Sequence, residues 1–311
     1  MNKRKNKKEH ILNQMTLSAE QQIHLQSFQT KLTLIEDRVR SVAGLYHTGC
    51  YLVGRPGTSK SFTVKKELDQ TGVAWVYKNA RMTPMGLFCF IAEHPDQILV
   101  LDDIGSLFKS EQALQILLAA LDGDPTKART ITYKSKDEDL RVQFTGGIIA
   151  LSNSPLRSDP LAKALGSRVV LVEHEPTDEE IAAYIYQLAL NGTDGLTATE
   201  CIEVSEFLIS ETRDADLRLD LRQYDKAVRD YRQYKNGHSQ TPWRDLVRTS
   251  LMRLATESHE PLSKKEEIEN QRQLVRQVMQ QFPDDIHAQL NATGLKKSTF
   301  YTRKKEVLAE A

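Results

Sequence analysis

The chain has 311 residues, a formal net charge of +0, 40% hydrophobic residues and 27% charged residues. These values are typical of a soluble globular protein with one large core and one or two smaller domains, and they exclude a global basic field. No apolar run is long enough to span a membrane, and the basic N-terminus lacks the apolar region of a signal peptide. The three cysteines are scattered without metal-like spacing, which favours a reducing, cytoplasmic environment.

The N-terminal part of the chain begins with a cationic run and continues with a helical pattern. The run from Met1 to His10 is too polar to be buried, so it either solubilises the chain or contacts a phosphate backbone. From Leu17 to Val42, apolar residues recur at helical spacing. This pattern predicts one or two amphipathic helices that pack on the core.

The stretch YLVGRPGTSKS, from Tyr51 to Ser61, predicts a strand, a glycine-containing loop and the start of a helix. Such a loop turns backbone N–H groups and a helix N-terminus toward one point, where a triphosphate can bind. Lys60 would reach the β- and γ-phosphates, and the Ser61 hydroxyl would ligate Mg²⁺. Ser59 stands where the pattern usually has glycine, which is favoured there for its backbone freedom. The predicted phosphate-binding residues are Gly54, Arg55, Pro56, Gly57, Thr58, Ser59, Lys60 and Ser61.

Two further strands are predicted after this loop, at Val73 to Tyr77 and at Ile98 to Leu101. The second is apolar on both faces, as in a parallel sheet, and runs directly into Asp102 and Asp103. Ligands bind at this end of the strands in open α/β sheets. In phosphate-loop ATPases an aspartate at this position, here Asp102, holds the Mg²⁺ shell, and the next acid, here Asp103, polarises the attacking water. The second acid is more often glutamate, so the shorter aspartate predicts slow or partner-dependent hydrolysis.

A helix is predicted at Glu111 to Leu121, followed by a hairpin-like polar insertion from Lys127 to Phe144. A fourth apolar strand, Gly147 to Leu151, leads to Asn153, and a fifth strand is predicted at Val169 to Val172. The amide of Asn153 would lie at a strand end beside the two acids. It could therefore hydrogen-bond the γ-phosphate or the lytic water.

The segments GRPGTSKS, ILVLDD, IIALSN and ALGSR resemble, in this order and at these separations, the Walker A, Walker B, sensor 1 and arginine-finger elements of AAA+ ATPases. The resemblance covers Gly44 to Met252. It implies that Asn153 is the sensor 1 residue. It also implies that Arg168 is the finger that reaches the nucleotide of a neighbouring subunit, with Arg157 as its nearest competitor. An arginine finger implies a ring or helical homo-oligomer with ATP sites between subunits, whereas the alternative for Arg168 is an ordinary surface charge.

The chain after residue 176 is predicted to be helical, with capping boxes at Thr177 and Thr197. The run from Asp214 to Tyr234 predicts a further amphipathic helix. This part resembles the helical lid of AAA+ ATPases. The segment from Leu219 to Arg222 resembles the sensor 2 element of that lid, which would place Arg222 near the γ-phosphate. The alternative for Arg222 is a solvated helix face shared with neighbouring charges.

A polar segment, Glu257 to Lys265, reads as a linker because it contains proline and has no apolar period. Three helices are predicted after it, at Glu266 to Phe282, Asp284 to Thr293 and Lys296 to Leu308. The last two are joined through a glycine turn and the second is basic. These features resemble a bacterial helix-turn-helix.

In the predicted helix-turn-helix, Leu295, Phe300 and Val307 would pack inward. Leu290 departs from the usual pattern, in which alanine lets the helices approach. The polar residues of the last helix would meet phosphates and base edges of double-stranded DNA. The alternative is a small helical bundle that binds protein. The predicted DNA-binding residues are Lys296, Lys297, Ser298, Thr299, Thr302, Arg303 and Lys305.

The sequence therefore predicts an α/β fold: a AAA+ parallel-sheet P-loop domain with a helical lid, followed by a small all-α helix-turn-helix module. The expected parts are residues 1–43 for the basic tail and N-terminal helices, 44–175 for the nucleotide-binding α/β domain, 176–256 for the lid and 257–311 for the linker and helix-turn-helix.

The preferred functional hypothesis is a DNA-associated ATPase that uses ATP and Mg²⁺ at intersubunit sites to drive or regulate assembly on double-stranded DNA. The DDIG and SN segments look similar to those of helicase loaders and transposition-regulator ATPases. This implies a role in DNA replication or mobile-element transposition, with a helicase or transposase as partner. One alternative is a MoxR-like protein-remodelling ATPase, in which a small residue also precedes the P-loop lysine. Another is an ATP-gated binding switch with little hydrolysis, motivated by Ser59 and Asp103.

Overall fold

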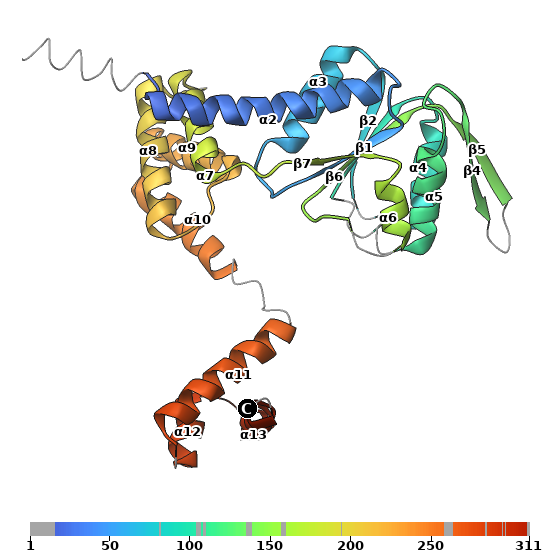
Figure 1. Ribbon diagram of the computed structural model, residues 1–311. Helices are drawn as coiled ribbons and strands as arrows, with labels where there is room; N and C mark the ends of the chain where they lie inside the picture. The colour runs from blue at the N-terminus through green and yellow to red at the C-terminus, as the bar shows by residue number, and fades with distance from the viewer. Residues whose placement is uncertain are drawn as a thin grey trace, which may run out of the picture. The chain divides into compact units, whose positions relative to one another are not determined.

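The chain forms two compact units in the computed structural model, Met1–Thr249 and Ser250–Ala311 (Figure 1). In the part of the chain that the structure describes, no helix combines the length and the apolar character needed to cross a membrane. The described residues are 16–80, 82–103, 107, 110–134, 139–156, 160–193, 195–257, 264–283, 285–293, 295 and 297–309.

A 5-stranded parallel sheet forms the centre of the first unit, with its strands in the order β2-β3-β6-β1-β7. Because parallel strands all end at the same edge of a sheet, the loops that follow β1, β3 and β6 meet at one carboxyl edge. The strands are β1 (Gly49–Val53), β2 (Trp75–Asn79), β3 (Ile98–Asp102), β6 (Gly147–Ser152) and β7 (Val170–Glu173).

Helices cover both faces of this sheet. On one face, α2 (Ala19–Ala43) and α3 (Lys60–Thr71) bury apolar residues such as Val39, Val64 and Leu68 against β1, β3 and β6. The sequence left open whether one or two helices precede the sheet, and in the described residues from Thr16 onward a single helix, α2, spans this stretch. In Figure 1 this long blue helix reaches from the sheet to α7.

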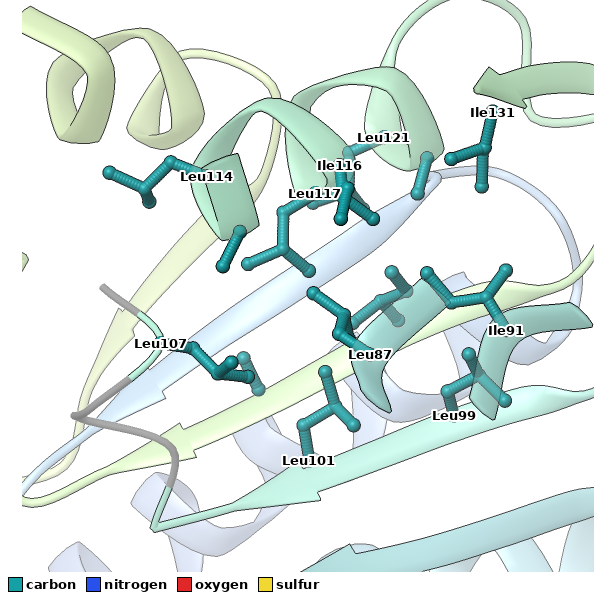
Figure 2. Packing of buried hydrophobic residues seen from close by; sticks show 14 of the residues in the cluster. Leu87, Ile91, Leu99, Leu101, Leu107, Leu114, Ile116, Leu117, Leu121 and Ile131 are labelled. Carbon is teal, nitrogen blue, oxygen red and sulfur yellow. The ribbon is translucent and has the colours of Figure 1, made fainter. Parts of the chain in front are cut away.

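The opposite face is covered by α4 (Pro84–Glu93), α5 (Glu111–Leu121) and α6 (Pro160–Gly166). Figure 2 shows Leu87 of α4 and Leu117 of α5 pointing toward the sheet, where Leu99 and Leu101 of β3 lie. Strands covered on both faces have no solvent side, which explains why β3 and β6 are apolar along their length. A parallel sheet with helices on both faces fits the AAA+ α/β fold expected from the sequence.

The insertion between α5 and β6 is the antiparallel hairpin that the sequence predicts, formed by β4 (Arg129–Lys134) and β5 (Asp139–Phe144). Ile131 and Phe144 are buried against the cluster under α4 and α5. Arg129 donates from Nη1 to the carbonyl oxygen of Ala120 at 2.8 Å, at the end of α5. The base of the hairpin is therefore fixed to the core.

Four helices follow β7: α7 (Asp178–Leu190), α8 (Ala198–Asp214), α9 (Leu221–Lys235) and α10 (Trp243–Glu257). The boundary between α8 and α9 differs from the prediction of a helix from Asp214 onward. α8 continues to Asp214, the chain reverses at Asp216 with φ 52°, and Asp220 caps α9. Likewise β2 begins at Trp75 and not at Val73, because Gly72, with φ 69°, ends α3 just before it.

The second unit contains α11 (Lys264–Gln281), α12 (Ile286–Thr293) and α13 (Lys297–Ala309). Its core consists of Val275, Phe300 and Val307, with Leu290 and Leu295 packed against them. The inward positions predicted for Leu295, Phe300 and Val307 are confirmed. Leu290 contributes to this small core, so the larger side chain is accommodated where alanine was expected.

Candidate nucleotide-binding site

The predicted phosphate-binding loop connects β1 to α3 at the carboxyl edge of the sheet. Ser59 adopts a left-handed conformation, with φ 75° and ψ 2°. Glycine reaches this region without strain, whereas a residue with a Cβ loses roughly 1–2 kcal/mol there. This conformation explains why glycine usually stands at this position. A strained backbone that persists at such a cost points to a functional constraint.

The Lys60 side chain is buried and folds back onto the loop that carries it. Its Nζ donates to the carbonyl oxygen of Gly54 at 2.5 Å and to that of Arg55 at 2.6 Å. Burial lowers the pKa of Lys60 to about 8, against the opposite influence of the Glu175 and Asp102 carboxylates. A buried ammonium of this kind gains from a phosphate, because an anion restores the preference for the charged form.

Asp102, at the end of β3, lies beside the start of α3. The hydroxyl of Ser61 donates to Asp102 Oδ2 at 2.7 Å, and the hydroxyl of Tyr77 donates to the same oxygen at 2.7 Å. The sequence predicts Ser61 and Asp102 as the residues that hold Mg²⁺, and it does not predict the contact with Tyr77. Ser61 and Asp102 thus place two hard oxygen atoms side by side, next to Lys60 in the first turn of α3.

Asp103 and Asn153 follow the neighbouring strands β3 and β6, and both side chains are exposed at the carboxyl edge. Asp103 has φ 55°, and its N–H donates to the carbonyl oxygen of Leu151 at 3.2 Å. The N–H of Gly54 donates to the carbonyl oxygen of Ser152 at 3.2 Å, which joins the phosphate loop to β6. The structure therefore brings Asp103 and Asn153 to the same edge as Lys60.

The start of α9 touches the phosphate loop. The N–H of Leu221 donates to the carbonyl oxygen of Gly57 at 2.9 Å. A Cβ at Gly57 would lie 2.6 Å from the Cβ of Asp220, so only glycine fits under this helix end. Arg222 lies in the first turn of α9 and is exposed, and its charge contributes to lowering the pKa of Lys60. Arg222 is therefore within electrostatic reach of the lysine.

Sequence reasoning missed the contacts that hold the other side of the loop. The Arg55 guanidinium donates to Asp178 Oδ1 at 2.7 Å, and its backbone N–H donates to Glu175 Oε1 at 2.9 Å. His174 Nε2 lies 2.8 Å from the carbonyl oxygen of Thr58. Because a carbonyl only accepts, this nitrogen must donate, and burial lowers the pKa of His174 and favours its neutral form. These partners follow β7, so they could be found only by knowing that β7 pairs with β1.

Arg168 is not part of this cluster. It lies just before β7, at the amino edge of the sheet, where its Nε donates to Asp122 Oδ1 at 3.0 Å and its Nη1 to the carbonyl oxygen of Ala164 at 3.0 Å. The opposite end of β7 is the one beside the phosphate loop. Any contact of Arg168 with a nucleotide would therefore involve the site of another copy of the chain. Its competitor Arg157 lies outside the described residues.

The residues predicted to bind DNA lie on α13, in the second unit. Arg303 differs from the others, because its Nη1 lies 2.7 Å from both carboxylate oxygens of Glu306 and its Nε donates to Gln271 Oε1 at 3.0 Å. Its guanidinium is therefore held within the unit. Lys296 lies outside the described residues. Thr299 is half-buried, and the exposed members of the set are Lys297, Ser298, Thr302 and Lys305.

The cluster at the carboxyl edge fits a nucleotide with Mg²⁺. Ser61 and Asp102 supply two oxygen atoms, and the described residues include no group of three or more His, Cys, Asp or Glu side chains that could hold a metal ion. Mg²⁺ typically takes one or two protein carboxylates together with phosphate oxygens and waters. The Ser61 hydroxyl and the Asp102 carboxylate beside a phosphate-binding loop match that preference.

No protein-family model and no curated protein matches the sequence. Among solved structures, two variants of RuvB from Thermotoga maritima match the chain. The first has a TM-score of 0.42 at 13% identity and covers 88% of this chain and 84% of that chain. The second has a TM-score of 0.41 at 13% identity and covers 92% and 87%.

Proposed function

We propose that this protein is a DNA-associated AAA+ ATPase that binds and hydrolyses ATP with Mg²⁺ at sites shared between neighbouring copies of the chain. The observation that carries the proposal is the convergence of Lys60, the Ser61–Asp102 pair and Asp103 at the carboxyl edge of the sheet. A cation, a pair of oxygen ligands and an exposed carboxylate at one edge of the sheet are what phosphoryl transfer to water requires.

In this proposal each group has one task. The loop N–H groups and Lys60 would hold the phosphates, and Ser61 and Asp102 would hold Mg²⁺, whose charge would offset that of the phosphate oxygens. Asp103 accepts a hydrogen bond from the attacking water and orients it. Asn153, after β6, and Arg222, in the first turn of α9, would bind the γ-phosphate.

Arg168 completes the site of a neighbouring copy. Its position at the amino edge, away from the Lys60 of its own chain, supports a role in trans. Such a role requires head-to-tail contacts between identical subunits, which close into a ring or continue as a helix. ATP would then stabilise the assembled state, since each nucleotide contacts two copies.

The C-terminal unit supplies DNA affinity through α13. Lys297 and Lys305 are exposed on this helix, together with Ser298 and Thr302. Exposed lysines beside small polar side chains suit a phosphate backbone and groove edges. The preferred context is DNA replication or transposition in the cytoplasm, with a helicase or transposase as partner.

Steady-state ATP hydrolysis by the purified protein, measured with and without double-stranded DNA, tests this proposal. Lys60→Ala serves as the blank. Stimulation by DNA would support it. Turnover that ignores DNA would favour a protein-remodelling ATPase, and ATP binding without turnover would favour an ATP-gated switch, which the shorter acid Asp103 already suggests.

The salt dependence of DNA binding tests the role of α13. Replacing Lys297 and Lys305 by glutamine should lower the slope of log affinity against log salt by about 2, because each phosphate contact contributes about 0.9. The matched control replaces Lys127 and Lys134, whose side chains are 78% and 77% exposed in the first unit. Equal slopes for the two double variants would remove α13 from the DNA-binding surface.

A further inference from the structure

Tyr77 is a residue of the candidate site to which the sequence pattern assigns no role. It belongs to β2, at the edge of the sheet, and β2 pairs only with β3 among the described strands. Its hydroxyl donates to Asp102 Oδ2 at 2.7 Å, the same oxygen that accepts the Ser61 hydroxyl at 2.7 Å. Two donors from different elements therefore converge on one oxygen of the carboxylate.

The ring of Tyr77 is itself held in place. Lys65 Nζ lies 3.3 Å from the ring centroid, a cation–π contact that comes from the same helix as Ser61. Asn79 Nδ2 lies 3.4 Å from the Tyr77 hydroxyl oxygen. The ring also packs against the apolar cluster between the sheet and helices α2 and α3. Because these contacts hold the Tyr77 ring in place, its hydroxyl can hold the Asp102 carboxylate in one orientation.

We propose that Tyr77 is a positioning residue that orients the Asp102 carboxylate toward Mg²⁺, an inference that rests on the proposed nucleotide site. Both hydrogen bonds that the described residues make to this carboxylate end on Oδ2. A carboxylate has acceptor sites on both oxygens, so two donors on one oxygen set the rotation of the group and direct Oδ1 elsewhere.

This orientation matters because the proposed Mg²⁺ site rests on the Ser61 hydroxyl and the Asp102 carboxylate. The Ser61 hydroxyl donates its single hydrogen to Asp102 and keeps its lone pairs for a cation. Of the two side chains that we assign to Mg²⁺, Asp102 carries the charge, so a misdirected carboxylate would weaken the site. Hydrogen-bond partners of metal ligands commonly change metal affinity 10–100-fold when they are removed.

The test is the Mg²⁺ dependence of nucleotide binding by Tyr77→Phe. This variant removes the hydroxyl and keeps the ring over which Lys65 lies. A fluorescent ATP analogue would be titrated in EDTA and at increasing MgCl2, without measuring turnover. We expect unchanged affinity in EDTA and a roughly tenfold higher MgCl2 concentration for the half-maximal Mg²⁺ effect. Tyr133→Phe, which removes a hydroxyl from the β4–β5 hairpin, should match wild type in both conditions.

Two outcomes would overturn the inference: a Tyr77→Phe protein with the Mg²⁺ dependence of wild type, or one that loses affinity equally in EDTA, as a purely structural role predicts. Failure of the proposed function would look different. In that case the wild-type protein would not bind the analogue, or Lys60→Ala would bind it as tightly as wild type.

Discussion

The two edges of the central sheet hold their charged residues in different ways. At the carboxyl edge, Lys60, Ser61 and Asp102 bond to groups from several elements, so the folding of one chain assembles them. At the amino edge, the charged partner of Arg168 is Asp122, and the two side chains are 33% and 66% exposed. Such an exposed pair is worth about 0–1 kcal/mol, so Arg168 can leave Asp122 at little cost. The carboxyl edge therefore holds its polar groups through several elements, whereas the amino edge holds Arg168 through an exposed ion pair and one carbonyl oxygen.

Lys60→Ala should produce the largest loss, because it removes the cation of the carboxyl edge. We expect the affinity for ATP to fall at least about a hundredfold, since hydrogen bonds to charged groups contribute about 1.5–3 kcal/mol each. Isothermal titration of the variant and wild type with ATP would measure this. Lys127→Ala, at an exposed lysine remote from the loop in sequence, should bind ATP as wild type does. Retained affinity in Lys60→Ala would place the nucleotide somewhere else.

The pH dependence of ATP binding should reflect the burial of Lys60. Burial lowers the pKa of Lys60 to about 8, and a phosphate binds the protonated form. The affinity for ATP should therefore be highest below this pKa and should fall as the pH rises through it. At one pH unit above the pKa, binding should be about tenfold weaker. Binding measured in EDTA between pH 7 and pH 9 would show the change. Lys60→Arg, whose guanidinium does not titrate in this range, should give a flat profile. A flat wild-type profile would contradict the assignment.

Ser59→Gly should have the smallest effect of these variants, and it should raise the stability of the protein. Glycine relieves the left-handed strain of roughly 1–2 kcal/mol, and it loses up to about 1 kcal/mol through its freer unfolded chain. The net gain in the free energy of unfolding should lie between about 0 and 1.5 kcal/mol, as measured by urea denaturation. Gly72→Ala, at φ 69° with open space around its Cβ position, should be destabilising by a similar amount. A destabilised Ser59→Gly protein would mean that the serine side chain, and not the backbone, fixes the loop.

The sequence predicted those parts of the fold and site that depend on local patterns. Helix α5 begins and ends where its apolar period predicts. Lys60 was found because it closes a glycine-containing loop that follows an apolar strand, and Asp102 because it stands at the end of one. Tyr77 and His174 were not found. Each depends on strand order, β2 beside β3 and β7 beside β1, which no local period encodes.

Side-chain partners set a second limit on prediction. Arg303 was predicted to face DNA, yet the structure holds it against Glu306, one helical turn away, and Gln271 of α11. The spacing of Arg303 and Glu306 was visible in the sequence, whereas the contact with Gln271 required knowing how α11 and α13 pack. The pattern of basic residues therefore predicts a DNA-binding role for this helix, and the packing of the unit determines which of its cations are exposed.

Mixing Lys60→Ala with Arg168→Ala tests most directly whether the two edges of the sheet act on one site in neighbouring copies. Each variant alone should hydrolyse almost no ATP, and Arg168→Ala should still bind it. In an equal mixture, turnover should recover to roughly a quarter of the wild-type rate, because half the sites keep Lys60 and half of those face an intact Arg168. A mixture as inactive as its components, or an Arg168→Ala protein with wild-type turnover, would contradict a site shared between copies.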